Sequence, residues 1–250
     1  MTFITPGQFQ LTSDQIAHSQ AVQAALLAHK ADIRSILSPE LQQQGSYRIH
    51  FAAQDTTTDG LNISEPEVVQ PFIQQQLREQ NVGFLYGGYN TERATYHSDL
   101  FDADSEGNAV DPNNIRNIHL AYDVWLEPET PLFSPLPATV FSVHNNNYHL
   151  DYGPTVILQH ELDNLTFWSL YGHLETRTLD HIMPGQQLAA GEQFAWVGYS
   201  HENIGWTPHA HVQIITDLLD NTVDFPGLCS QNTREFYTTL CPDAGLLFTL

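Results

Sequence analysis

Strict alternation of polar and apolar side chains marks residues 209–214, near the C-terminal end of the chain. Successive side chains of a β-strand point to opposite faces of a sheet, so the pattern predicts a strand. His209, His211 and Gln213 would share one face of it, with apolar residues on the other. Two imidazoles about 7 Å apart suit a metal site with a catalytic neighbour. Taken alone, such a pair is more often a hydrogen-bonded pair of histidines on a solvent-facing strand.

Residues 117–124 alternate in the same way and predict a second strand. It would present His119, Ala121 and Asp123 on one face, where a residue as small as Ala121 leaves room for an ion. A helix would also bring positions four apart together, but the β-branched and aromatic residues favour a strand. Histidine and aspartate are common zinc ligands, and three protein ligands with an open fourth position are typical of a catalytic zinc site.

Other strand-like segments recur between these two, at residues 138–143, 155–160, 167–174 and 193–198. The links between them are rich in Gly, Pro, Asn and Asp, as expected of turns. The fold class predicted from this half of the chain is mainly β (α+β overall), built on an antiparallel β-sheet.

The first third of the chain has a different pattern. Apolar positions at helical spacing predict helices over residues 13–37 and 68–77, with a short strand at 47–51 between them. We therefore predict an N-terminal helical appendage at residues 1–85 and a catalytic domain at residues 86–250.

The charge balance narrows the possible partners. Eight basic residues stand against 29 acidic ones, a formal net charge of −21, which argues against binding to nucleic acid and to anionic membranes. The sequence has no apolar run long enough to span a bilayer, and its start lacks the features of a signal peptide. A cytoplasmic location is the default expectation. Cys229 and Cys241 form no disulfide framework and are expected to be reduced.

A third histidine completes the candidate chemistry. His173 ends the apolar segment at residues 167–174, a place where a lone histidine is more often structural. Beside a metal centre, however, a neutral imidazole can orient the attacking water or stabilise an oxyanion. Strand parity places Tyr171 on the face of His173, where its hydroxyl could assist.

These residues resemble, in order, the signatures of the M23 zinc metallopeptidases, the lysostaphin-like or LytM-like family that includes many peptidoglycan endopeptidases. The matching segments are HLAYD at 119–123, YGHL at 171–174 and HAH at 209–211, together with PLPATV at 135–140 and the glycine-containing segment at 184–198. The resemblance covers roughly residues 117–216.

The resemblance implies a barrel-sandwich-type LytM-like fold and a zinc-dependent endopeptidase acting on peptide or peptidoglycan-like substrates. Carried over position by position, it makes His119, Asp123 and His211 the zinc ligands and His173 and His209 the catalytic pair. Family members usually have Gly where this chain has Ala121, so we expect the added methyl group to narrow the site.

A narrower likeness appears at residues 151–155, 205–206 and 224–227. These segments resemble an M23-like branch that is often found between a kinase-like domain and a class III aminotransferase domain in bacterial proteins. In that setting the domain is cytosolic, in agreement with the default location above.

The same residues suggest three alternatives to a peptidase. The same centre could hydrolyse a non-peptide amide or ester, and an M23-like domain could also serve as a non-catalytic regulatory or binding module. The third alternative, a biotinyl or lipoyl carrier, needs a lysine at a hairpin tip. The single lysine, Lys30, lies in the first predicted helix, which excludes a carrier. The acidic stretch at residues 102–108 could also fold over the site and offer a carboxylate to the metal.

Overall fold

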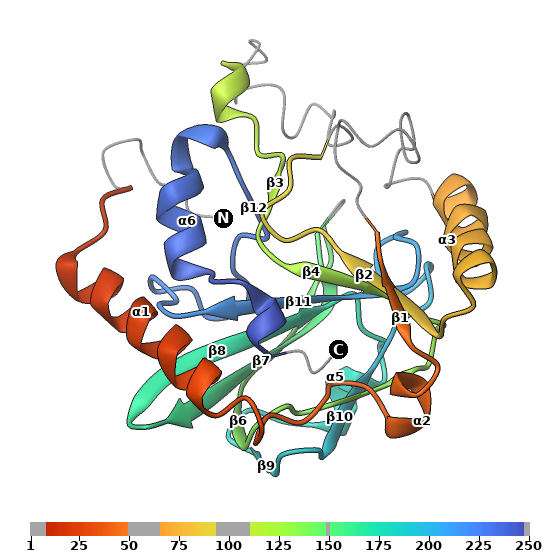
Figure 1. Ribbon diagram of the computed structural model, residues 1–250, viewed down its shortest axis with the longest axis horizontal. Coiled ribbons are helices and arrows are strands. Elements are labelled where there is room, and N and C mark those ends of the chain that lie inside the picture. The colour runs from red at the N-terminus through yellow and green to blue at the C-terminus, as the bar shows by residue number, and fades with distance from the viewer. Residues whose placement is uncertain (1–8, 50–65, 94–110, 149–150, 248–250) are drawn as a thin grey trace.

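A computed structural model describes residues 9–49, 66–93, 111–148 and 151–247. Its centre is an eight-stranded sheet (Figure 1). In sheet order the strands are β1 (Ser46–Arg48), β2 (Phe84–Gly87), β4 (Tyr122–Trp125), β11 (His209–Ile215), β8 (Leu165–Gly172), β7 (Gly153–Leu162), β6 (Ala138–Asn146) and β9 (Gln187–Leu188). The mainly β class is confirmed, but the sheet is mixed rather than wholly antiparallel, because β1 runs parallel to β2.

Smaller elements surround this sheet. Two short antiparallel pairs join β5 (Pro131–Phe133) to β10 (Gln193–Trp196) and β3 (Ile118–His119) to β12 (Leu228–Cys229). The α-helices of the described residues are α1 (Ser13–Ala28), α2 (Pro39–Gln42), α3 (Pro66–Gln80), α5 (Thr178–His181) and α6 (Arg234–Leu240). Helix α1 crosses β7 and β8 and contacts α6, whereas α3 lies beside β2 (Figure 1).

The first helix is shorter than the sequence pattern predicts. It begins after a Thr12 cap and ends at Ala28, not near residue 37. The chain beyond it makes a turn at residues 29–32 and then an irregular segment. In this segment the backbone carbonyl of Ile36 accepts a hydrogen bond from the Phe133 amide at 3.0 Å, and Ile36 is fully buried. Ile33, Ile36 and Leu37 therefore pack into the core from an irregular segment beside β5, which overrides their helical spacing.

The N-terminal segment is built into the main sheet. Strand β2 crosses the predicted boundary between residues 85 and 86 and pairs with β4. Helix α3 packs Val69 and Ile73 into an apolar cluster that includes Trp125 and Trp206. Residues before 88 thus contribute two strands to the main sheet and part of one apolar cluster. The division into two domains stays a prediction.

The predicted strand at residues 117–124 is broken into β3 and β4. Leu120 lies in one apolar cluster with Ile118, whereas Tyr122 and Val124 lie in another. The interruption turns the chain, because the two apolar pairs pack into different parts of the core. The expectation of one continuous alternating strand is therefore wrong, although its two halves were located correctly.

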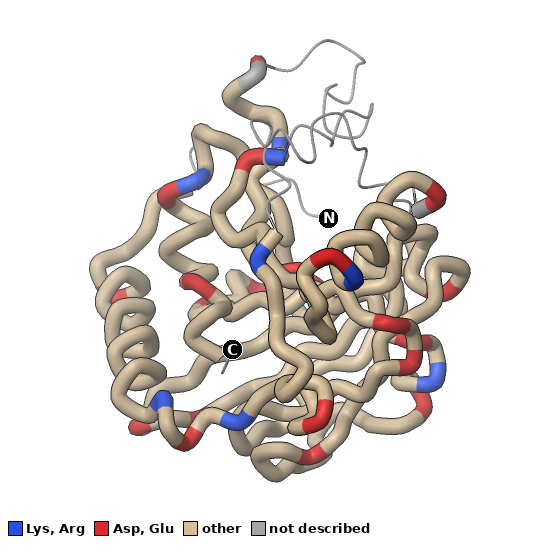
Figure 2. The backbone as a smooth tube through the Cα atoms, turned by 45° about the vertical axis from the view of Figure 1, so that its right-hand side comes forward, with Lys and Arg blue, Asp and Glu red and all other residues tan. Residues whose placement is uncertain are grey.

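Acidic positions outnumber basic ones along the described part of the chain (Figure 2). Among the described residues, no helix has both the length and the apolar character that crossing a bilayer requires. Cys229 and Cys241 are both free thiols, as expected, and both are fully buried. The acidic stretch at residues 102–108 lies outside the described residues.

Candidate metal centre

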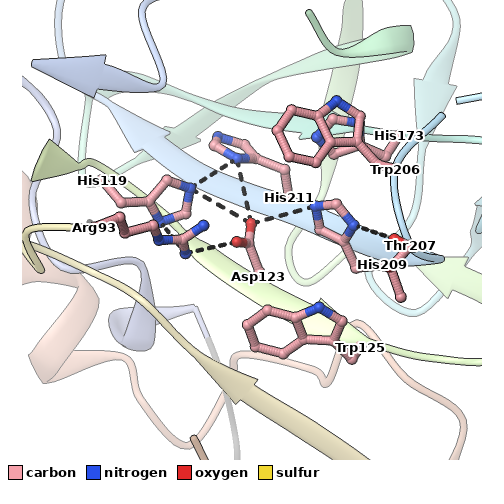
Figure 3. A pocket seen from close by; sticks show the side chains of 9 residues that line it. All are labelled: Arg93, His119, Asp123, Trp125, His173, Trp206, Thr207, His209 and His211. Carbon is pink, nitrogen blue, oxygen red and sulfur yellow. Dashed lines mark hydrogen bonds and ion pairs between the residues drawn. The ribbon is translucent and has the colours of Figure 1, made fainter. Parts of the chain in front are cut away.

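One small cavity gathers the polar residues that the sequence pattern singled out (Figure 3). Its volume is about 30 Å³, enough for about two water-sized groups. The residues that line it are Arg93, His119, Asp123, Trp125, His173, Trp206, Thr207, His209 and His211. All five polar residues predicted for the metal and for catalysis are therefore among its walls.

Strand pairing explains how the first two ligand candidates meet. Strands β4 and β11 are antiparallel neighbours, and their register places His211 directly opposite Asp123. Nδ1 of His211 lies 3.5 Å from Oδ1 of Asp123. Directly opposed residues of an antiparallel pair have neighbouring side chains on the same face of the sheet. Their partners on the other face, Val124 and Ala210, are buried in the apolar core.

His119 reaches the same point from β3. Its Nε2 lies 3.5 Å from Oδ1 of Asp123 and 3.3 Å from Nδ1 of His211. Ligands bound about 2.0–2.2 Å from one tetrahedral ion lie roughly 3.4 Å from one another. The three candidate ligand atoms therefore have the spacing that a tetrahedral zinc site requires, and the residues present fit the metal.

A hydrogen bond holds the His211 imidazole in a suitable tautomer. The side-chain oxygen of Gln213 lies 2.9 Å from Nε2 of His211, so that nitrogen carries the proton and Nδ1 keeps its lone pair for a metal. Nδ1 of His119 lies 3.2 Å from the backbone carbonyl of Gly88 and 3.0 Å from Nη2 of Arg93, a group that can only donate, so these contacts select no single tautomer of His119. The nitrogen of His119 that faces Asp123 and His211 is Nε2.

Asp123 carries the negative charge of the site. Its Oδ2 accepts a hydrogen bond of 2.7 Å from Nη2 of Arg93. Its Oδ1 is buried without a hydrogen-bond partner among the described residues. Burial would raise the pKa of Asp123, but the adjoining His119 and Arg93 outweigh it and hold that pKa well below its usual range. A buried, charged and unsatisfied oxygen is costly alone and becomes favourable when a cation binds it.

Two further imidazoles stand beside the three ligands. The rings of His173 and His209 have centroids 4.3 Å apart, and Nε2 of His209 lies 3.6 Å from Oδ1 of Asp123. Nδ1 of His209 donates to the backbone carbonyl of Thr207 at 2.6 Å. Nδ1 of His173 is buried without a partner in the described part of the chain.

Burial controls the protonation of this pair. Desolvation lowers the pKa of His173 well below its ordinary value, and the nearby His209 and His211 lower it further. Desolvation likewise lowers the pKa of His209. Both imidazoles are therefore neutral at neutral pH, which leaves each ring one nitrogen that can accept a proton and one N–H that can donate. The indole of Trp125 stacks on His209 with an interplanar angle of 27°.

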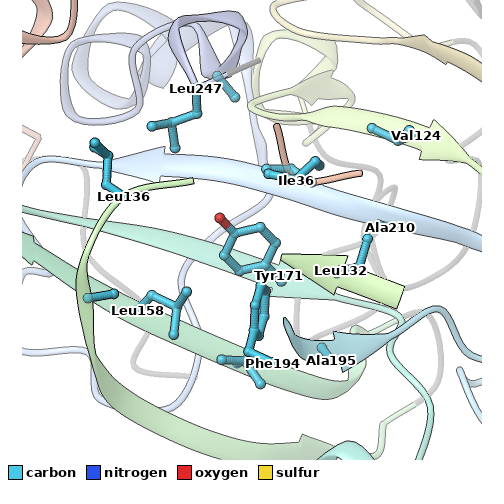
Figure 4. Packing of buried hydrophobic residues seen from close by; sticks show 14 of the residues in the cluster. Ile36, Val124, Leu132, Leu136, Leu158, Tyr171, Phe194, Ala195, Ala210 and Leu247 are labelled. Atoms are coloured by element: carbon cyan, nitrogen blue, oxygen red, sulfur yellow. The ribbon is translucent and has the colours of Figure 1, made fainter. Parts of the chain in front are cut away.

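Tyr171 does not join the site. Its side chain lies in the apolar core, with its ring 4.8 Å from that of Phe194 (Figure 4). The parity argument is wrong here because β8 ends at Gly172 and His173 adopts a positive φ of 60°. That backbone conformation turns the His173 side chain away from the alternation of the strand, toward the cavity.

Several cavity residues carried no signal in the sequence. Arg93, Trp125 and Thr207 line the cavity, but none belongs to an alternating pair of ionisable residues or to a segment with a family resemblance. Trp206 also lines the cavity, and the sequence singled it out only through the likeness at residues 205–206. Gln213 shares a face with His211 in the sequence pattern, yet its hydrogen bond to that ring could not be foreseen without the rotamers. Among the remaining histidines, His160 is a buried core residue, His144 and His201 are exposed, and His149 lies outside the described residues.

Comparison with known proteins relates part of this sequence to a known family. The sequence profile of peptidase family M23 matches residues 117–224. No curated protein matches the sequence. Similar solved structures include the catalytic domain of the antimicrobial peptidase lysostaphin from Staphylococcus simulans, with 19% identity and a TM-score of 0.34, over 44% of this chain and 77% of that one.

Two further structures are similar at the same level. A zinc-containing peptidase from Vibrio cholerae has 19% identity and a TM-score of 0.32, over 53% of this chain and 36% of that one. A mutant catalytic domain of a prophage-encoded M23 protein from Enterococcus faecalis has 20% identity and a TM-score of 0.32, over 50% of this chain and 83% of that one. The profile match includes all five predicted site residues. Residues 117–224 of this chain thus match peptidase family M23 by sequence.

Proposed function

We propose that the protein is a zinc-dependent metalloendopeptidase that hydrolyses amide bonds in short peptides or in peptidoglycan-type peptides. The observation that carries the proposal is the cluster of His119, Asp123 and His211, whose ligand atoms all lie within 4.8 Å of one another. Two nitrogen donors and one oxygen donor, with room for a fourth ligand, match the ligand sets of catalytic zinc sites. The peptidase family of residues 117–224 supports the same reaction class.

A zinc ion at these ligands would act as a Lewis acid toward the scissile carbonyl and would lower the pKa of a water molecule. The chain supplies the proton transfers. Because Nδ1 of His209 donates to Thr207, its Nε2 is left as the proton acceptor that faces the centre. The ring of His173 lies beside that of His209 and is also neutral. We assign its N–H group to stabilise the negative charge that develops on the carbonyl oxygen.

The walls of the cavity support this assignment. The indoles of Trp125 and Trp206 lie against the His209 ring, with centroids 6.2 and 6.3 Å away. Such apolar walls exclude bulk water and strengthen the electrostatic interactions inside the cavity. The proposed active centre is therefore a small group of polar side chains flanked by the indoles of Trp125 and Trp206.

The test combines metal analysis with an activity screen. We expect one zinc ion per purified chain, and release of new amino groups from short peptides containing Gly or D-Ala or from peptidoglycan fragments. Chelation should abolish that release and zinc should restore it. Stoichiometric zinc without any amine release would favour a non-peptide hydrolase or a non-catalytic binding module, whereas absence of metal binding would reject the proposal.

A further inference from the structure

Arg93 lies outside the segment matched by the family profile, yet its side chain reaches the centre of the site. Only 2% of Arg93 is exposed. Its Nη2 lies 2.7 Å from Oδ2 of Asp123 and 3.0 Å from Nδ1 of His119. Arginine is rarely buried unless it is paired, and here it meets two of the three candidate ligands at once (Figure 3).

The backbone around Arg93 is arranged to hold this contact. The Arg93 amide donates to the carbonyl of Asn117 at 2.8 Å, and the His119 amide donates to the carbonyl of Thr91 at 3.0 Å. These bonds fix the segment at residues 91–93 alongside β3. Gly88 has φ +106°, and a Cβ atom at that position would overlap Nη2 of Arg93. A side chain is excluded there by both the backbone conformation and the guanidinium group.

The contact with Arg93 gives the two carboxylate oxygens of Asp123 different surroundings. Oδ2 is occupied by Arg93, whereas Oδ1 has no hydrogen-bond partner among the described residues and lies 3.5 Å from the ligand nitrogens of both His119 and His211. A purely structural ion pair gives no reason to leave one buried carboxylate oxygen unsatisfied. The asymmetry suits a carboxylate that offers a single oxygen to a metal.

Resting on the proposed function, we propose that Arg93 is a positioning residue that restricts Asp123 to ligation through Oδ1 alone. By occupying Oδ2, the guanidinium group keeps the carboxylate from binding the ion through both oxygens. It thereby preserves a four-coordinate centre with one position for water or substrate. Residues before the segment that matches family M23, Gly88 and Arg93, thus complete the shell around its metal ligands.

The experiment compares Arg93→Gln and Arg93→Lys with Arg234→Gln. Arg234 is the matched control because its guanidinium group binds the oxygens of Asn90, in the same loop, without touching a candidate ligand. Zinc affinity is measured by competition with a chelator. The visible spectrum of the Co²⁺-substituted protein is the second measurement, since Co²⁺ absorbs more strongly in four-coordinate than in five-coordinate sites.

For Arg93→Gln we expect zinc affinity to fall about 10- to 100-fold, with weaker Co²⁺ absorption as Asp123 binds through both oxygens. Arg93→Lys keeps the positive charge beside Asp123 and so protects the fold, but it lacks the planar fork. We expect it to shift both measurements in the same direction by less. Arg234→Gln should resemble the wild type in both.

Unchanged affinity and an unchanged Co²⁺ spectrum in Arg93→Gln would overturn the inference while leaving the proposed function intact. If Arg93→Gln does not fold, wild-type behaviour of Arg93→Lys in both measurements would overturn it equally. A wild-type protein that binds no metal would overturn the proposed function, and this inference with it.

Discussion

His160 and His173 are both buried histidines associated with the main sheet, but their ring nitrogens have different surroundings. His160 lies on β7, where Nδ1 donates to the carbonyl of Pro137 at 3.1 Å and Nε2 accepts from the Ser169 hydroxyl at 2.7 Å. Its ring stacks on Phe167. His173 lies just after β8, lines the cavity, and has a buried Nδ1 without a partner among the described residues.

The difference shows that burial does not separate a structural histidine from a functional one. A buried polar atom left without a hydrogen bond costs about 1–3 kcal/mol, so a fold that retains one beside a cavity favours a ligand there. Both nitrogens of His160 are satisfied within the protein, and it needs no further role. The cavity histidines differ, because they retain ring nitrogens that could bind a metal or a substrate.

The largest expected effect breaks the metal site itself. We expect His211→Ala to weaken zinc binding by about 4 kcal/mol, roughly a thousandfold, because it removes one of three protein ligands. His160→Gln should retain the metal at the wild-type stoichiometry. Equilibrium dialysis followed by metal analysis measures both. Loss of zinc from the His160 variant, or full retention by the His211 variant, would contradict the distinction between the two groups of histidines.

The next effect separates binding from turnover within the cavity. We expect His209→Ala to keep zinc and to lower kcat by about 10²- to 10⁴-fold, since it removes the proton acceptor but no ligand. The exposed His144, changed to Ala, is the control and should leave kcat unaltered. Steady-state kinetics on a peptide cleaved by the wild type provide the measurement. A His209 variant with wild-type kcat and full zinc would remove this residue from the mechanism.

The free energy of unfolding at acid pH should report on His160, the histidine whose ring nitrogens are both hydrogen-bonded within the protein. Burial lowers the pKa of His160 to about 4, whereas an unfolded histidine titrates near 6.5. The unfolded state therefore takes up a proton first as the pH falls, and the folded state loses stability between about pH 6.5 and pH 4. The loss amounts to about 3 kcal/mol at its maximum.

His160→Gln removes that difference, so its free energy of unfolding should fall less over this pH range than that of the wild type. Urea denaturation of the metal-free proteins at a series of pH values measures the effect. The exposed His144→Gln is the control and should follow the wild type. Identical pH profiles for the His160 variant and the wild type would mean that His160 is not held neutral by burial.

The smallest effect concerns the support of a ligand. The side-chain oxygen of Gln213 accepts a hydrogen bond from Nε2 of His211, and its amide nitrogen donates to the Pro226 carbonyl at 3.0 Å. We expect Gln213→Leu to weaken zinc binding about tenfold, because the His211 ring loses the bond that sets its tautomer. Chelator competition measures it, with Gln159→Leu on β7 as the matched control. Equal affinity in the two variants would limit Gln213 to packing.

Much of the site was predictable from the sequence because its residues belong to short strands. In β11 the alternation of His209 and His211 with Ala210 and Val212 is a local property, set by the pleat of a single strand. The structure buries Ala210 and Val212 in the core, and both histidines line the cavity. Strand β4 keeps Asp123 on the same face, as the pattern predicted.

The failures occur where a strand ends or breaks. The parity that assigned Tyr171 to the site does not extend past Gly172, because His173 adopts a positive φ. The single strand predicted at residues 117–124 is interrupted, so that its apolar residues enter two different clusters. In each case packing against distant segments decided the backbone conformation, and no local pattern encodes that choice.

By itself the sequence determined the β-rich class and the imidazoles and carboxylate that belong together, since alternation along a strand follows from covalent geometry alone. Only the tertiary structure decided what surrounds them. Arg93 meets Asp123 across thirty positions of the chain, and Gly88 leaves the space for it. Contacts of this kind depend on how strands pair and how side chains fill the space between them, which is a property of the whole packed core.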